Sequence, residues 1–142
     1  MLGEDYHFDV VRPGIAMYGI NPTFNIKNPF DFSIKVEAKV LQIIDIEAGE
    51  TVGYGCTFKA GRRTKIATIS MGYADGIPWQ ASTSNSFVMF GSKKAKIIGR
   101  VSMDLTTVDV TDIDFVKVGD FATVFSKERP FEDWSIEFYK LE

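Results

Sequence analysis

The stretch Ser-Ile-Lys-Val-Glu-Ala-Lys-Val-Leu-Gln-Ile-Ile-Asp-Ile, residues 33–46, gives the clearest indication of the fold. Apolar side chains at Ile34, Val36, Ala38 and Val40 alternate with charged ones, which is the period of a strand with one buried face. The second half of the stretch is rich in β-branched residues, which strands favour. The next four residues, Glu-Ala-Gly-Glu, read as a turn. The stretch therefore predicts one long strand that ends in a turn.

Shorter segments of the same character recur towards the C-terminus and predict strands over residues 65–71, 87–90, 95–101, 106–110 and 121–125. Residues 91–94 join two of these segments as a hairpin turn. The connections are short, so the sequence predicts a mainly β chain, with antiparallel strands in a barrel or a sandwich. Near the end, Pro130 and the acidic residues 132 and 133 predict a short C-terminal helix over residues 131–141.

Composition limits the classes of function. At 142 residues, 45% hydrophobic and 25% charged, the chain has the make-up of one folded domain rather than a disordered segment. The net charge of −3 argues against a nucleic-acid partner, which needs a basic surface. No apolar run reaches the length of a membrane span, and the N-terminal residues do not read as a signal peptide. We therefore expect neither nucleic acid nor membrane as a partner.

Cysteine and histidine are too few for several kinds of chemistry. Cys56 is the one cysteine, so an internal disulfide is impossible, and a reducing, cytoplasmic location is expected. His7 is the one histidine, which excludes zinc sites built from several His and Cys ligands. The N-terminal part differs from the rest of the chain. Residues 9–19 are apolar and are followed by a loop rich in Asn and Pro, which predicts a strand of a preceding domain and a linker.

Four short stretches carry residue types that a plain β domain does not need. They are Arg-Pro-Gly-Ile-Ala-Met-Tyr-Gly (12–19), Val-Gly-Tyr-Gly-Cys-Thr-Phe (52–58), Met-Gly-Tyr-Ala-Asp-Gly (71–76) and Ile-Gly-Arg-Val-Ser-Met-Asp (98–104). Each has an ordinary structural interpretation, as a strand end, a turn or a bulge. Each also has a chemical one. Glycines on both sides of Tyr54, for example, would expose its ring, and a phenol acts as a base near neutral pH only where its phenolate is stabilised.

In this order, the four stretches resemble the C-terminal part of bacterial alanine racemases, which are fold-type III enzymes that use pyridoxal 5′-phosphate. The resemblance runs from about residue 9 to residue 125. It implies that residues 1–31 are the remnant of the last strand of a cofactor-binding barrel with a linker, and that residues 32–142 are an antiparallel β-barrel C-terminal domain. It also implies interconversion of L- and D-alanine, which supplies D-alanine for peptidoglycan, by a homodimer whose active sites are shared across the subunits.

The resemblance also implies roles for residues of the β domain. Tyr54 matches a catalytic acid–base that acts in the active site of the partner subunit. Tyr73 matches a tyrosine that lines the substrate entry, and Met103 matches a residue whose backbone N–H faces the substrate carboxylate. Asp104 follows Met103 and is expected to help orient that loop.

Three residues of the N-terminal part match contacts to the cofactor. Arg12 matches an arginine that faces the pyridine nitrogen, and Gly14 and Ile15 match backbone donors to the phosphate. The family's lysine that binds the cofactor covalently has no counterpart here, and mid-strand Lys39 is not taken for it. We therefore expect that this chain is a fragment and is inactive alone.

Two departures from the family pattern accompany the match. Ile-Pro-Trp-Gln at residues 77–80 stands where the family usually has an arginine, and Tyr139 cannot be aligned with the family's late tyrosine. Other functions also remain open. A broad-specificity amino-acid racemase shares the tyrosine, whereas the decarboxylases of this fold carry a cysteine motif in its place. A non-catalytic β-barrel binding module would not need Arg12, Tyr54, Tyr73 and Met103 together. A catalytic Tyr54 should be exposed beside Tyr73 and Met103.

Overall fold

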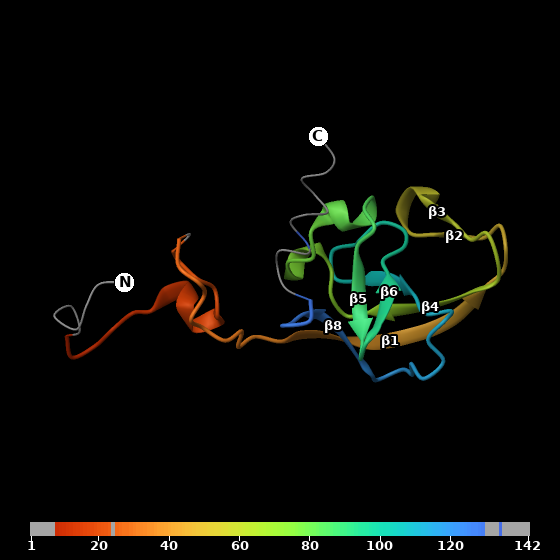
Figure 1. Cartoon of the computed structure of the whole chain (residues 1–142). Coiled ribbons are helices and arrows are strands. Elements are labelled where there is room, and N and C mark those ends of the chain that lie inside the picture. Colours follow the sequence, from red (N-terminus) through yellow and green to blue (C-terminus); the bar gives the residue numbers. More distant parts are fainter. Residues whose placement is uncertain (1–7, 24, 130–133, 135–142) are drawn as a thin grey trace. The chain divides into compact units, whose positions relative to one another are not determined.

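The structure is a computed structural model that describes residues 8–23, 25–129 and 134. The chain divides into two compact units, Met1–Ile34 and Lys35–Glu142 (Figure 1). All strands of the described residues lie in the second unit. The expected helix over residues 131–141 falls, apart from Trp134, outside the described residues.

The first unit contains a short 3-10 helix, η2 (Gly14–Tyr18), where the sequence favours a strand. The described residues of this unit contain no strand. A strand formed here would therefore have no neighbouring strand to pair with its backbone N–H and C=O groups. Local hydrogen bonds hold the unit instead. The Asn28 side chain donates to Gly19 O at 2.9 Å, and the Ser33 hydroxyl donates to Met17 O at 2.6 Å.

The second unit is mainly β, as the sequence predicts. Its strands are β1 (Val36–Ile46), β2 (Thr51–Val52), β3 (Phe58–Lys59), β4 (Thr64–Ile69), β5 (Phe87–Phe90), β6 (Lys93–Lys96), β7 (Thr106–Asp109) and β8 (Phe121–Phe125). Three short 3-10 helices, η3 (Tyr54–Cys56), η4 (Tyr73–Asp75) and η5 (Trp79–Ser82), lie in the loops. The hairpin differs from the prediction, because β6 begins at Lys93 and leaves only residues 91 and 92 between the strands.

The main sheet curls into a nearly closed antiparallel barrel. Its strand order is β6-β5-β8-β1-β4-β7, with β2 and β3 as a separate pair. The two outer strands approach each other, because Ile97 forms a bridge with Val108 just after β6, and Ile98 N–H donates to Thr107 O at 3.0 Å. Few strand edges are therefore left unpaired.

A bulge in β1 lets this strand contribute to two cores. The pairing with β4 shifts between Val40 and Gln42, so Leu41 is an extra residue in β1. Before the bulge, Ala38 and Val40 enter the main barrel core. After it, Ile43 packs against that core, while Ile46 joins a second cluster beneath β2 and β3. The bulge thus reverses the phase of the alternation seen in the sequence.

Aromatic stacking anchors the chain after β8. Arg129 is fully buried, with its guanidinium 3.8 Å from the ring centroid of Phe87 and 4.4 Å from that of Trp134. Its Nε also donates to Phe87 O at 3.1 Å. Nearby, the hydroxyl of Ser126 donates to the Glu128 carboxylate, which lowers the pKa of Glu128. The contacts of Arg129 with Phe87 hold the chain after β8 against β5.

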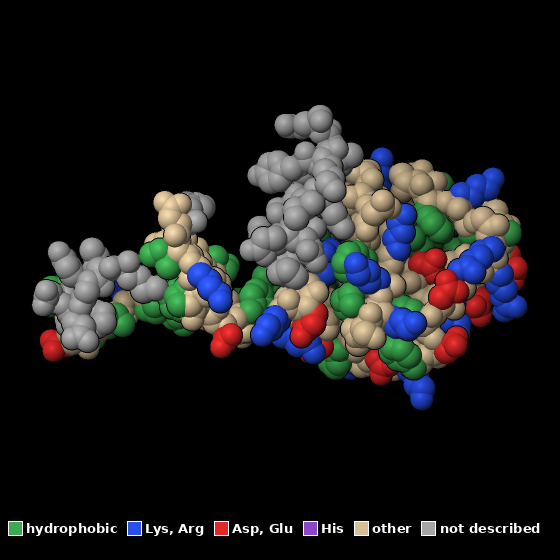
Figure 2. Space-filling model, in the orientation of Figure 1, with side chains coloured by type: hydrophobic (Ala, Val, Ile, Leu, Met, Phe, Trp, Pro, Cys, Tyr) green, Lys and Arg blue, Asp and Glu red, His purple; other side chains and the backbone are tan. Residues whose placement is uncertain are grey.

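The surface of the second unit carries charges of both signs. Basic and acidic side chains are interspersed over the face seen in Figure 2. Exposed ion pairs such as Arg62–Asp112, at 2.8 Å, join some of them. Within the described part of the chain, no helix has the length and apolarity needed to cross a membrane.

Candidate functional site

Tyr54 projects from a loop that two glycines shape. Gly53 and Gly55 have φ angles of 78° and 72°, which side-chain-bearing residues rarely adopt. A Cβ on Gly53 would lie 2.9 Å from the backbone nitrogen of Arg100, so this loop meets residue 100 only because Gly53 has no side chain. The Tyr54 side chain is 72% exposed, and its hydroxyl has no hydrogen-bond partner among the described residues.

Tyr73 and Met103 are brought together by two loops in backbone contact. Tyr73 N–H donates to Ser102 O at 3.0 Å, and Ala74 N–H donates to Met103 O at 2.9 Å. Gly72 makes this approach possible, because a Cβ there would lie 2.5 Å from the carbonyl carbon of Met103. Both the Tyr73 and Met103 side chains are exposed.

The three residues meet in a hollow of about 340 Å³, which we call the tyrosine hollow. Its lining consists of Tyr54, Tyr73, Trp79, Arg100, Val101, Ser102 and Met103. A second depression of about 480 Å³, the strand hollow, is lined by Gln42, Gly53, Tyr54, Thr68, Arg100, Ser102, Leu105 and Thr107. Gln42 pairs with Thr68 and Thr68 pairs with Thr107, so a row of polar residues crosses three strands. Tyr54, Arg100 and Ser102 line both hollows.

Four residues that line the tyrosine hollow were not chosen from the sequence: Trp79, Arg100, Val101 and Ser102. Arg100 belongs to a motif that the sequence singled out, but only Met103 and Asp104 of that motif were assigned roles. Trp79 belongs to the stretch noted only as a departure from the family. A charged residue where a strand is interrupted was the available signal for Arg100, whereas nothing local placed Trp79 in the site.

The other predicted residues lie elsewhere. Asp104 is exposed and does not line either hollow. Arg12, Gly14 and Ile15 belong to the first unit, where the side chains of Arg12 and Ile15 are exposed. Gly14 has a φ of +57°, and no atom lies within 4 Å of the position that a Cβ would take. The roles assigned to these four residues stay predictions.

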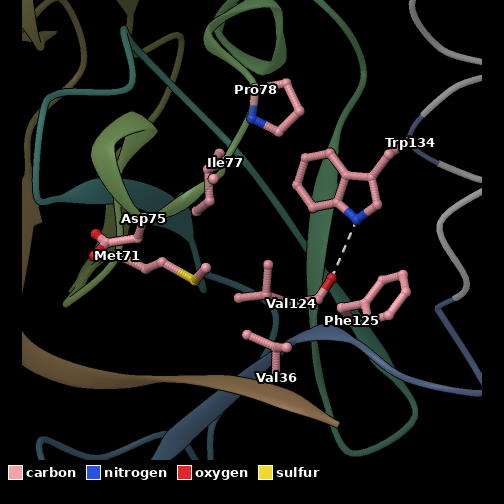
Figure 3. A pocket seen from close by; sticks show the side chains of 9 residues that line it. Val36, Met71, Asp75, Ile77, Pro78, Val124, Phe125 and Trp134 are labelled. Carbon is pink, nitrogen blue, oxygen red and sulfur yellow. Dashed lines mark hydrogen bonds between the residues drawn. The ribbon is translucent and has the colours of Figure 1, made fainter. Parts of the chain in front are cut away.

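An apolar cavity of about 220 Å³ lies beside the turn that contains Asp75 (Figure 3). Met71, Ile77, Pro78, Val124 and Trp134 are among its lining residues, and Trp134 Nε1 donates to Val124 O at 3.1 Å. Asp75 also lines it, and its carboxylate accepts the N–H of Gly72 at 2.9 Å. That bond closes the turn that presents Tyr73. Within the described ranges, no group of three or more His, Cys, Asp or Glu residues could hold a metal ion.

The second unit is thus a β-barrel domain that presents an exposed tyrosine in a surface hollow. The family described as "Alanine racemase, C-terminal domain" matches residues 33–139. The chain therefore belongs to the alanine racemase family. The expectation that its fold is the C-terminal β domain of that family is confirmed.

Individual relatives and solved structures agree with this assignment. The alanine racemase of Acidiphilium cryptum is 48% identical over 137 residues, which are 96% of this chain and 38% of the relative. The biosynthetic alanine racemase of Mesorhizobium japonicum is 37% identical over 93% of this chain and 34% of its own length. The crystal structure of alanine racemase from Bartonella henselae with covalently bound pyridoxal phosphate matches with a TM-score of 0.80 and 42% identity, over 97% of this chain and 38% of that one. This chain thus spans a little over a third of the length of these relatives.

Proposed function

We propose that this chain supplies the acid–base tyrosine, Tyr54, to the active site of an alanine racemase. The observation that carries the proposal is the Tyr54 phenol, which is exposed in the tyrosine hollow with its hydroxyl unpartnered among the described residues. A tyrosine that served only packing would bury its ring and satisfy its hydroxyl. An exposed, fixed phenol is instead available to a ligand.

Racemisation explains why a single tyrosine is needed at this place. Inverting a stereocentre requires one group to remove the α-proton from one face and another to return a proton to the opposite face. Tyr54 is the group on one face, and a base outside this chain is the group on the other. The Tyr73 and Met103 loops line the hollow beside Tyr54, so an amino acid bound there would lie next to the phenol.

The substrate carboxylate would be held by the Met103 loop. Met103 N–H has no acceptor among the described residues, so it is free to donate to an anion. Ser102 donates through its hydroxyl to Leu105 O at 2.9 Å and accepts Leu105 N–H at 3.2 Å, which fixes the turn that contains Met103 and Asp104. Asp104 lies in this turn and would help to orient it.

The first unit has features that fit pyridoxal phosphate. Arg12 carries an exposed guanidinium for the pyridine nitrogen. Open space where Gly14 would carry a Cβ allows a phosphate close to the backbone N–H groups of Gly14 and Ile15. The chemistry that the cofactor supplies when bound is withdrawal of electrons from the amino acid's α-carbon, which acidifies its proton. The family's lysine for covalent attachment has no counterpart in this chain, so we infer that this chain alone is inactive.

We place the working site between two subunits of a cytoplasmic homodimer. An exposed tyrosine hollow needs a second surface to exclude water from the reaction. A second subunit would supply that surface, so each β barrel would complete the site of its partner.

The test is Tyr54→Phe in the full-length protein, with racemisation and α-proton exchange measured separately. We expect racemisation of alanine to fall by about a hundredfold or more, as for other losses of general acid–base groups. Exchange of the α-proton with deuterated solvent should persist from one enantiomer only, because the base on the opposite face is intact. Cofactor absorbance should be unchanged.

Cys56→Ser is the matched control, because Cys56 is an exposed residue of the same loop. It should racemise alanine normally. Equal loss of exchange from both enantiomers in Tyr54→Phe would contradict the one-sided role. Normal racemisation by Tyr54→Phe would favour the non-catalytic binding module.

A further inference from the structure

Trp79 is held rigidly at the rim of the tyrosine hollow. It opens η5 directly after Pro78, between Ile77 and Ala81, which are 2% and 0% exposed. Ser82 is the last residue of this short helix, and its hydroxyl oxygen accepts the N–H of Val101 at 2.8 Å. This bond ties the helix to the segment that carries Arg100. The indole ring itself remains half exposed. Its backbone is therefore fixed while its ring faces the hollow.

The indole ring lies against the guanidinium of Arg100. The Arg100 Cζ atom is 5.8 Å from the centroid of the Trp79 ring, within the range of a cation–π contact. A Cβ on Gly55 would lie 3.7 Å from the same Cζ atom. The guanidinium therefore lies near both the Trp79 ring and the backbone of the loop that presents Tyr54.

Arg100 carries a charge that no described neighbour neutralises. No aspartate or glutamate lines the tyrosine hollow or the strand hollow. None of the ion pairs among the described residues includes Arg100. A cation therefore faces the space beside Tyr54 where an amino acid would enter.

We propose that Trp79 is a positioning residue for specificity, which holds the Arg100 guanidinium beside Tyr54 so that amino acids with cationic side chains are disfavoured. This inference rests on the proposed racemase function and assigns to Arg100 and Trp79 the discrimination against cationic side chains. A lysine or arginine side chain in the hollow would bring a second positive charge near Arg100, and no described residue that lines the hollow supplies a carboxylate between them. The α-carboxylate of any amino acid would be attracted by the same charge.

The test compares L-alanine with L-lysine as substrates of the full-length protein, using the ratio of their kcat/KM values. Arg100→Ala should lower this ratio about three- to tenfold, as expected for one like charge a few ångströms away near a surface. Trp79→Ala should lower it in the same direction but less, mainly through KM. Trp79→Phe keeps an aromatic face for the guanidinium and should retain most of the selectivity.

The double variant Trp79→Ala/Arg100→Ala should have the ratio of Arg100→Ala alone, because Trp79 acts through Arg100. Phe115→Ala removes an exposed aromatic side chain outside both hollows and is the control. Additive effects in the double variant would overturn the inference. So would a Trp79→Ala variant that slows both substrates equally.

Fluorescence of this 142-residue chain tests the contact without any activity. The chain has two tryptophans, and Trp79 is the exposed one whereas Trp134 is 4% exposed. Acrylamide quenching therefore reports mainly on Trp79. Arg100→Ala should increase quenching because it uncovers one face of the indole, and Trp79→Phe should remove that response. Unchanged quenching in Arg100→Ala would overturn the inference. Absent racemisation with increased quenching would instead count against the proposed function.

Discussion

Gly72 is the residue that allows the two loops of the tyrosine hollow to touch. Its φ of −137° suits any residue, so the requirement for glycine is steric rather than conformational. We expect Gly72→Ala to lower the free energy of unfolding by about 2–4 kcal/mol, because the methyl group would overlap the backbone of Ser102 and Met103. Urea denaturation of this chain measures the loss.

Gly61→Ala is the control for that substitution. Gly61 has no atom within 4 Å of the Cβ position and no positive φ. Alanine there should be neutral or should stabilise the chain by up to about 1 kcal/mol, through a smaller entropy of the unfolded state. If both variants unfold at the same urea concentration, the close approach at Gly72 is not needed for stability.

At the scale of the element, β1 shows how a bulge changes which side chains a strand buries. Strict alternation from Val36 to Val40 would place Ile44 in the main core and Ile43 outside it. The extra residue Leu41 reverses this, so Ile43 packs against the main core while Ile44 is 43% exposed. The half before the bulge therefore serves the barrel core alone, whereas the half after it serves both, with Ile43 in the barrel core and Ile46 in the second cluster.

That reversal predicts unequal costs for two neighbouring substitutions. Ile43→Ser should lower the free energy of unfolding by about 2 kcal/mol, because it removes apolar contacts from the main core. Ile44→Ser should cost less than about 1 kcal/mol, as for other exposed positions. The urea midpoints of the two variants decide the matter, and a larger loss for Ile44→Ser would mean that the strand is regular at Leu41.

At the scale of the whole molecule, the proposed sharing of active sites predicts complementation between two inactive proteins. Tyr54→Phe would damage the site that a subunit completes, whereas Arg12→Ala would damage the site in its own first unit. A mixed dimer of these full-length variants keeps one intact site, so co-expression should restore about a quarter of normal racemisation if subunits pair at random. Racemisation assays of the co-purified mixture measure this. Sites contained within single subunits would leave the mixture inactive.

Much of this site was readable from the sequence because its motifs are local. Tyr54 lies between two glycines that adjacent residues reveal, and the turn around Tyr73 is written in one short stretch. Arg100 and Trp79 could not be paired in that way. Their contact depends on the tie between Ser82 and Val101 and on the meeting of Gly53 with the backbone of Arg100, and both join segments far apart in the chain.

The fold shows the same difference between features that local sequence predicts and features that depend on contacts between distant segments. Local patterns predicted the strands of the main sheet to within a few residues, because alternation and β-branched residues act over neighbouring positions, but they missed the short pair β2 and β3. Three features followed only from long-range contacts: the change of faces in β1 at Leu41, the 3-10 helix over residues 14–18, and the near closure of the barrel at Ile97 and Val108. Each of these depends on which backbone groups find partners, and those partners are supplied by distant parts of the chain or, for the first unit, are absent from its described residues.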